Sequence, residues 1–392
     1  MAYAHRPIHD ADAHVMETPE WLEPWADPGI RERLPALFLA SVKPGEERMI
    51  DTFRRRHADP AYRAEDAEKI LLRKNWAATG SFLAEDRPRA LDLLGFESQL
   101  VFNTFLNGKL LAAERGDDVE YAYGFARAHN RSMAAFCEAD PRLLATGYVP
   151  LRDFERSERM AAEVIEMGCK ALLVPSGCPR GHAPSHPGLD PIWARAQEAG
   201  LPIVFHVGGG LRQSDHQLLD RDYFANGGPP IPDFHGGDEN FRSVDYMAIP
   251  TAPMQTLATL IFDGVLDRFP ELRFGVIEQG ASWVPSWMRF MDSAFEAFRR
   301  NEERLQKLSL KPSEFARRQV RATPYPAEDV GWIVENAGEE VCLFSSDFPH
   351  VEGGRNPIKR FEGSMQDLSE PQKQRFYYDN FADLMGSGLP AE

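Results

Sequence analysis

The chain has 392 residues, of which 43% are hydrophobic, enough apolar material for a large core. Its formal net charge of −16, from 60 acidic and 44 basic residues, would repel a polyanion and argues against nucleic-acid binding. No apolar run approaches the roughly 20 residues needed to cross a bilayer, and residues 1–12 lack the apolar core of a secretory signal, so we expect a cytoplasmic protein without a membrane span.

Eight short runs of β-branched and aliphatic residues alternate with longer amphipathic stretches. This alternation predicts eight parallel strands separated by helices, and a closed (β/α)8 barrel of the TIM type rather than an open sheet. The predicted strands are Pro7–Ala13, Gln99–Thr104, Leu143–Val149, Lys170–Val174, Pro202–Val207, Leu272–Ile277, Gln319–Thr323 and Val341–Ser345.

Two intervals between predicted strands are too long for simple connections. The first contains the charged, helix-like stretch Glu46–Lys74, and the second contains the Gly/Pro/Asp-rich stretch Gly208–Asp238 followed by the helical Met254–Phe269. We therefore expect a single barrel domain with insertions after the first and fifth strands, at about 18–90 and 208–253. Such insertions are typical of a lid or substrate pocket, although surface decoration or a dimer contact fits the composition equally well.

Three of the predicted strands end in side chains that bind metals. Because residues i and i+2 of a strand share a face, Asp12 and His14 point together, and His206 ends another apolar run directly before Val207 and three glycines. Asp347 follows the eighth run. Imidazole and carboxylate groups on converging strand ends are good ligands for a divalent transition metal, and zinc, iron and manganese all suit the mixture, as one ion or two.

Each of these signals has an ordinary structural alternative. An Asp-x-His pair is frequent by chance, a lone histidine such as His206 is more often a hydrogen-bonded core residue, and Asp347 with Pro349 fits an Asx-type turn. Their coincidence at three strand ends favours the metal site. His350 and Glu352 could orient Asp347 from behind.

Glu278 ends the sixth predicted strand, and its role can be interpreted in three ways. It could be an additional metal ligand, it could transfer protons, or it could pair with an arginine. The sequence contains neither a G-x-S-x-G elbow nor a Walker-type loop, so nothing in it favours serine-nucleophile or nucleotide chemistry.

Several motifs together resemble the amidohydrolase superfamily, specifically the branch of aminocarboxymuconate-semialdehyde decarboxylase and related aromatic-acid decarboxylases. The resemblance covers most of the chain. Its motifs are Asp10-Ala-Asp-Ala-His14-Val-Met-Glu17, Ala139-Asp-Pro-Arg-Leu143, Val149-Pro-Leu151, Ser185-His-Pro-Gly-Leu-Asp190-Pro-Ile-Trp193, Phe269-Pro-Glu-Leu-Arg273, Trp283-Val-Pro285, Ser345-Ser-Asp-Phe-Pro-His350 and Asn380.

The resemblance implies a role for each candidate residue. Asp12 and His14 correspond to the first-strand metal pair, which is commonly His-x-His, while His206 and Asp347 match the ligands of the fifth and eighth strands. Where the decarboxylases carry a catalytic histidine after the sixth strand, this chain has Gln279, so Glu278 could instead hold a second metal. His235, in the second insertion, is another candidate for the active site, but the sequence of the insertion does not place it relative to a strand.

We therefore rank three functions. The first is metal-dependent hydrolysis of an amide, ester or thioester, with Asp347 accepting the proton of an activated water and Glu278 and His350 assisting. The second is non-oxidative decarboxylation, or related lyase or hydratase chemistry, on an aromatic or unsaturated acid. The third is a non-catalytic barrel, which predicts no bound metal.

The expected partner is a small molecule, an apolar or aromatic acid derivative. The insertions carry the aromatic residues that would line a pocket for a bulky acyl group, or would equally line a dimer interface: Trp76, Phe82, Tyr223, Phe224 and Phe234. The resemblance implies a homodimer.

Overall fold

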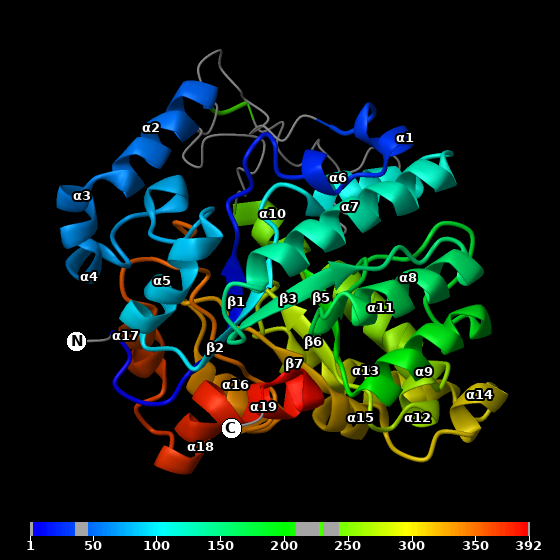
Figure 1. The fold of residues 1–392 in the computed structure, drawn as a ribbon. Helices are drawn as coiled ribbons and strands as arrows, with labels where there is room; N and C mark the ends of the chain where they lie inside the picture. Colours follow the sequence, from blue (N-terminus) through cyan, green and yellow to red (C-terminus); the bar gives the residue numbers. More distant parts are fainter. Residues whose placement is uncertain (1–2, 36–45, 209–226, 230–242, 391–392) are drawn as a thin grey trace.

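The computed structural model describes residues 3–35, 46–208, 227–229 and 243–390. Its centre is a curved sheet of seven parallel strands that follow one another in chain order (Figure 1). The strands are β1 (His9–His14), β2 (Ser98–Phe102), β3 (Leu143–Tyr148), β4 (Ala171–Leu173), β5 (Ile203–His206), β6 (Phe274–Ile277) and β7 (Val320–Ala322). All of their residues are buried, as expected for strands covered on both faces.

The eighth predicted strand, Val341–Ser345, departs from the expected pattern. The structure has no regular strand there but two isolated parallel bridges, Ala322 to Cys342 and Ala13 to Phe348. The Leu343 N–H donates to Ala322 O (3.0 Å), and the Ala11 N–H donates to Phe344 O (3.0 Å). This segment therefore joins β7 to β1, and the predicted α/β barrel is confirmed.

A side chain explains why the last segment is irregular. The N–H of Ser346 donates to Asp10 Oδ1 (2.8 Å) rather than to a carbonyl of a neighbouring strand. The fully buried Asp10 carboxylate on β1 thus takes the place of a backbone carbonyl as the acceptor of this hydrogen bond. A hydrophobic run predicts an extended segment, but it does not reveal that a side chain will take over one of its hydrogen bonds.

Helices surround the sheet and cover its outer face (Figure 1). They are α1 (Pro28–Arg31), α2 (Glu46–Ala58), α3 (Pro60–Ala64), α4 (Asp66–Lys69), α5 (Arg87–Leu94), α6 (Asn107–Arg115), α7 (Val119–Cys137), α8 (Phe154–Glu166), α9 (Asp190–Ala199), α10 (Ser243–Ala248), α11 (Thr251–Phe262), α12 (Val265–Arg268), α13 (Val284–Phe298), α14 (Glu303–Gln306), α15 (Pro312–Gln319), α16 (Val330–Ala337), α17 (Pro357–Ser364), α18 (Glu370–Gln374) and α19 (Asn380–Met385).

The two long helical stretches predicted in the insertions are each divided. Asp59 and Pro60 end α2 and begin α3, because proline has no N–H to continue the helix and the Asp59 side chain caps the N–H of Ala61. In the other stretch Gly264, at φ 74°, separates α11 from α12. Most of the second insertion, and with it His235, Tyr223, Phe224 and Phe234, lies outside the described residues.

The first insertion is fastened to the barrel by a separate apolar cluster. Ile50 of α2, Trp76 and Phe82 pack against Met16, just after β1, and Phe105, just after β2. Trp76 stacks on Phe105 with ring centroids 5.5 Å apart. The insertion therefore sits at the carboxyl ends of the first strands, where barrel enzymes place their active sites.

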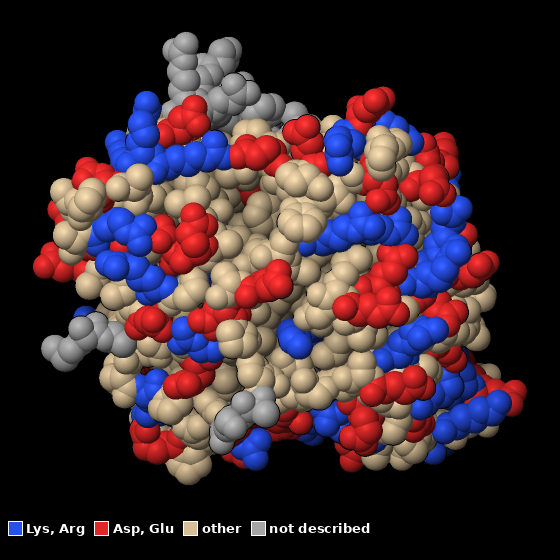
Figure 2. Space-filling view, in the orientation of Figure 1, with Lys and Arg blue, Asp and Glu red and all other residues tan. Residues whose placement is uncertain are grey.

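The visible surface carries both signs of charge without a continuous basic stripe (Figure 2). Among the described residues, no helix is both long and apolar enough to cross a bilayer.

His129 of α7 makes stability depend on pH. It is fully buried, and neither ring nitrogen has a hydrogen-bond partner in the described part of the chain. Burial lowers its pKa from 6.5 to about 3, so only the unfolded chain takes up a proton here between those values. The folded state therefore loses stability as the pH falls below 6.5.

The wild-type protein loses unfolding free energy when the pH falls from 7.5 to 5. We expect this loss to be about 2 kcal/mol smaller in His129→Gln. Urea unfolding of both proteins at the two pH values measures this difference. Equal losses in the two proteins would contradict the prediction.

Candidate metal centre

The first strand places two metal-binding side chains side by side at its end. Asp12 and His14 are each 1% exposed, and His14 Nε2 lies 3.1 Å from Asp12 Oδ1. The two side chains share a face because they are two residues apart in β1, as the sequence predicted.

His206 and Glu278 bring two further donors from neighbouring strand ends. His206 is the last residue of β5 and pairs in register with Ile277 of β6, which Glu278 follows. His206 Nε2 lies 3.4 Å from Asp12 Oδ1 and 3.4 Å from Glu278 Oε2. The donor atoms of Asp12, His14, His206 and Glu278 all lie within 4.8 Å of one another.

Backbone carbonyls fix how the two histidines face this group. His14 Nδ1 lies 2.9 Å from Asn103 O, and His206 Nδ1 lies 3.1 Å from Val207 O. A carbonyl oxygen can only accept, so both Nδ1 atoms carry hydrogen, and a neutral ring then presents its Nε2 lone pair to the carboxylates. This is the arrangement that metal-binding histidines adopt.

Asp347 and His350 form a second group that shares His14. Asp347 Oδ1 lies 3.5 Å from His14 Nε2 and 2.9 Å from His350 Nδ1. On its other side, His350 Nε2 lies 2.9 Å from the hydroxyl of Thr104, which donates to Val15 O at 2.7 Å. Sequence reasoning missed Thr104, because it follows a different strand and has no motif of its own.

The buried carboxylates and histidines shift one another's pKa values. Burial would raise the pKa of Asp12, yet His14 and His206 hold it well below its usual range. Burial and the neighbouring Asp12 raise the pKa of Asp347 well above its usual range. Burial and the nearby His350 lower the pKa of His14, while Asp12 opposes this shift.

Lone pairs therefore converge on one small volume. The buried Nε2 of His14 has no hydrogen-bond partner in the described part of the chain, although carboxylates lie beside it. Acceptors that face one another without a donor repel, and a divalent cation removes that repulsion. These residues fit a site for a divalent metal.

Asp10 supports the centre from behind. Its carboxylate accepts hydrogen bonds from the Ser346 hydroxyl (2.6 Å) and from Gln99 Nε2 (2.8 Å), and Gln99 Oε1 accepts from the buried Arg87. Burial raises the pKa of Asp10 to about 7. Because it lies two residues before Asp12 and binds the residue before Asp347, Asp10 fixes these two carboxylates relative to each other.

The first insertion also reaches the rim of the site. The Asn75 N–H donates to Pro349 O (3.0 Å), and Lys74 Nζ donates to Gly354 O (2.6 Å). Burial lowers the pKa of Lys74, while Asp347 and Glu352 oppose this shift. Lys74 is thus a cation close to Asp347 that sequence reasoning did not single out.

Gln279 and Glu352 occupy different surroundings. Gln279 is buried beside Glu278, and its Nε2 has no hydrogen-bond partner among the described residues. Glu352 is exposed, and its charge contributes to the raised pKa of Asp347. Glu352 belongs to neither group of mutually close donors.

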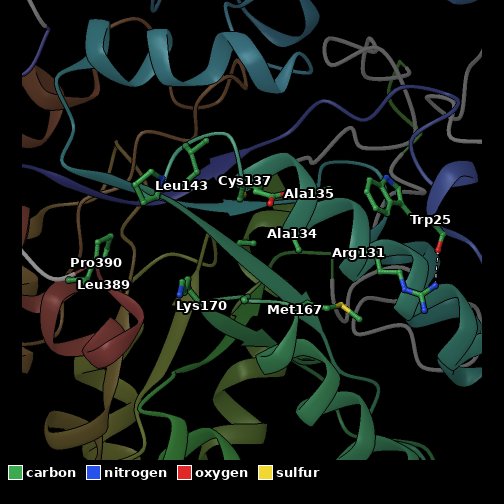
Figure 3. Close-up of a pocket in the computed structure, with 14 residues that line it drawn as sticks. Trp25, Arg131, Ala134, Ala135, Cys137, Leu143, Met167, Lys170, Leu389 and Pro390 are labelled. Carbon is green, nitrogen blue, oxygen red and sulfur yellow. Dashed lines mark hydrogen bonds between the residues drawn. The ribbon is translucent and has the colours of Figure 1, made fainter.

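A pocket of about 730 Å³ lies at the opposite end of the strands (Figure 3). Its lining includes Leu143, which begins β3, and Lys170, which directly precedes β4. It contains none of the metal-binding donors, so we do not associate it with the chemistry of the centre.

The sequence matches the model of the amidohydrolase family over residues 10–386, which is nearly the whole chain. The chain therefore belongs to the amidohydrolase family, and the resemblance found in its motifs is confirmed. No protein of curated function has a significant match to it.

Solved structures share the fold at low sequence identity. An amidohydrolase from Mycobacterium avium subsp. paratuberculosis is 23% identical with a TM-score of 0.70, over 98% of this chain and 100% of that one. 5-Carboxyvanillate decarboxylase from Novosphingobium aromaticivorans, with manganese and 4-hydroxy-3-methoxy-5-nitrobenzoic acid, is 18% identical with a TM-score of 0.62 (97% and 96% covered). A dihydroxybenzoic acid decarboxylase from Polaromonas, with manganese and 2-nitroresorcinol, is 15% identical with a TM-score of 0.61 (98% and 100% covered).

Metal binding should stabilise the folded chain. We expect Mn²⁺ at 100 times its Kd to raise the free energy of unfolding by about 2.7 kcal/mol, because the unfolded chain has no assembled site. His206→Ala should abolish this increment, whereas His129→Gln, which alters a buried histidine outside both donor groups, should keep it. Denaturant unfolding with and without Mn²⁺ measures the increment, and an undiminished increment in His206→Ala would contradict the assignment.

Proposed function

We propose that the protein is a metal-dependent, non-oxidative decarboxylase of an aromatic or unsaturated carboxylic acid. The observation that carries the proposal is the Asp347–His350 pair, an acid of raised pKa held against a metal-binding group of four donors. The sequence alone placed hydrolysis first. The decarboxylases among the structural neighbours support the alternative better, since two of them hold manganese with an aromatic ligand.

A divalent cation bound here supplies Lewis-acid chemistry, drawing electron density from substrate oxygens. The chain supplies the proton. As the bond to the carboxylate carbon breaks, its electron pair stays on the substrate carbon, carbon dioxide leaves, and Asp347 protonates that carbon. One proton is consumed for each carbon dioxide released.

His350 is placed to restore the proton of Asp347. Because the Thr104 hydroxyl donates to Val15 O, its oxygen accepts the Nε2–H of His350. The Nδ1 of His350 then faces Asp347 at 2.9 Å, the distance of a direct proton transfer. Thr104 thus orients His350, and His350 returns a proton to Asp347.

The surroundings suit a flat, apolar substrate. Phe105 follows Thr104 directly and stacks on Trp76, and both pack with Met16 and Phe82 beside the carboxyl end of β1. An apolar wall next to a cationic centre favours an acid with an aromatic body. Lys74, close to Asp347, adds a positive charge at the rim.

Hydrolysis of an amide, ester or thioester is the second candidate. It is favoured by Gln279, which stands where the resemblance places the histidine of the decarboxylases, and by the extra carboxylate of Glu278. In that reaction Asp347 would accept a proton from water and return it to the leaving group.

A substrate panel separates the two functions. We expect the purified, Mn²⁺-loaded protein to release carbon dioxide from one or more hydroxybenzoates and to leave thioesters, esters and amides intact. Headspace analysis of carbon dioxide and chromatography of the products measure both reactions. Hydrolysis without carbon dioxide release would reverse the ranking.

Asp347→Asn should lower kcat for decarboxylation by about 10²- to 10⁴-fold, because the amide cannot deliver a proton. Thr104→Val should cause a smaller loss, since His350 remains but is no longer held in one orientation. Steady-state kinetics on the active substrate measure both effects. A fully active Asp347→Asn variant would exclude the proposed proton path.

A further inference from the structure

We propose that Glu17 is a positioning residue of the metal centre, and that it acts on His14 through the peptide group that joins Asn103 to Thr104. The inference rests on the proposed function in that the site holds a divalent cation. It goes beyond the candidate ligands, because Glu17 belongs to neither group of mutually close donors.

The Glu17 carboxylate is fully buried, three residues beyond the end of β1. The backbone nitrogen of Thr104 lies 3.1 Å and 3.0 Å from its two oxygens, and that of Phe105 lies 3.2 Å and 3.3 Å from them. A carboxylate is tolerated in the interior where hydrogen bonds satisfy it, and backbone N–H groups are suitable donors. Glu17 therefore fixes the loop 103–105, which lies between β2 and α6.

One peptide group connects this carboxylate to a candidate metal ligand. The peptide between Asn103 and Thr104 is trans, so its C=O and its N–H point in opposite directions. The N–H donates to Glu17, and the oxygen lies 2.9 Å from Nδ1 of His14. Glu17, the peptide and the His14 ring thus form a continuous hydrogen-bonded chain. It ends at His14 Nε2, which faces Asp12 at 3.1 Å.

The negative charge of Glu17 strengthens this chain. A carboxylate that accepts from an N–H polarises the peptide, which makes the carbonyl oxygen a stronger acceptor. The Nδ1–H of His14 is then held more firmly by Asn103, and the lone pair on Nε2 becomes a better donor to a metal. Glu17 therefore acts as the carboxylate partner of a metal-binding histidine, with one peptide group between them.

The same loop carries two further groups of the site. The Thr104 hydroxyl lies 2.9 Å from His350 Nε2, and Phe105 stacks on Trp76. Because Glu17 accepts from the N–H groups of both loop residues, it holds the metal ligand, the proton path and the aromatic wall in one arrangement.

Mn²⁺ affinity of the metal-free full-length protein tests the assignment, measured by electron paramagnetic resonance of the free ion. We expect Glu17→Gln to weaken Mn²⁺ binding by about tenfold or more, because a neutral amide polarises the peptide less and turns an NH2 group toward the backbone donors. His206→Ala is the positive control.

Glu114→Gln is the matched control variant. Glu114 is also buried and accepts a backbone N–H, that of Leu151 at 2.8 Å, but it lies outside both donor groups. Its replacement should leave Mn²⁺ affinity within about twofold of the wild type, as expected for an independent site. A general effect of losing a buried carboxylate would weaken both variants alike.

A second measurement follows the His14 ring directly, by nuclear magnetic resonance of ¹⁵N-histidine-labelled, Zn²⁺-loaded protein. The Nδ1–H proton of His14 should move to lower frequency in Glu17→Gln, because its hydrogen bond to Asn103 weakens. It should stay in place in Glu114→Gln. The loss of one signal in His14→Ala assigns the resonance.

Wild-type Mn²⁺ affinity in Glu17→Gln, or an unmoved His14 resonance, would overturn the inference. Circular dichroism melting checks the fold of each variant. If Glu17→Gln does not fold, Glu17→Asp keeps the charge but is one methylene group shorter and loses its reach to the loop. Affinity equal to the wild type in that variant would again overturn the assignment.

The test is independent of the proposed function. A wild-type protein whose Mn²⁺ affinity depends on Glu17 but which releases no carbon dioxide from any acid would remove the decarboxylase proposal alone. An active decarboxylase whose Mn²⁺ affinity is unchanged in Glu17→Gln would remove the positioning role alone.

Discussion

The metal centre depends on carboxylates and imidazoles that are buried together at the ends of the strands. Asp12, Glu278 and Asp347 approach two histidines whose Nδ1 hydrogens are already engaged by backbone carbonyls. Burying ionised carboxylates without compensation costs several kcal/mol each, even after the surroundings relax. A divalent cation meets this requirement, and the same charge that stabilises the site makes it a Lewis acid.

Closure of the barrel is what brings the carboxylates together. Between β1 and the segment after β7, regular pairing gives way to isolated bridges, and the Asp10 carboxylate binds both the N–H and the hydroxyl of Ser346. The Asp10 side chain thus helps to close the barrel directly beside the metal centre. Because Asp12 and Asp347 each lie within two residues of this contact, it sets their separation.

Glu278 and Asp347 both have a positive φ, which is uncommon for residues other than glycine. Glu278 has φ 53° and directly follows β6, and Asp347 has φ 52° and directly precedes Phe348, which bridges to β1. At these points the side chains of Glu278 and Asp347 reach His206 and His14, at 3.4 Å and 3.5 Å. Such strain persists only where the surroundings hold it, here through Thr323 and Tyr325 at Glu278 and through the Asp347 N–H, which donates to Asp12 O.

The sequence by itself determined the barrel and most of the donors, since alternation along a strand fixes which side chains share a face and apolar runs mark the strands. Asp12 and His14 follow directly from that period. The tertiary structure decided that Glu278 joins Asp12, His14 and His206 in one group of close donors, that Asp347 and His350 form a second group with His14, and that Thr104 and Asp10 support them. The physical reason is that distances between strand ends depend on register, closure and left-handed turns, and none of these leaves a periodic signal in the chain.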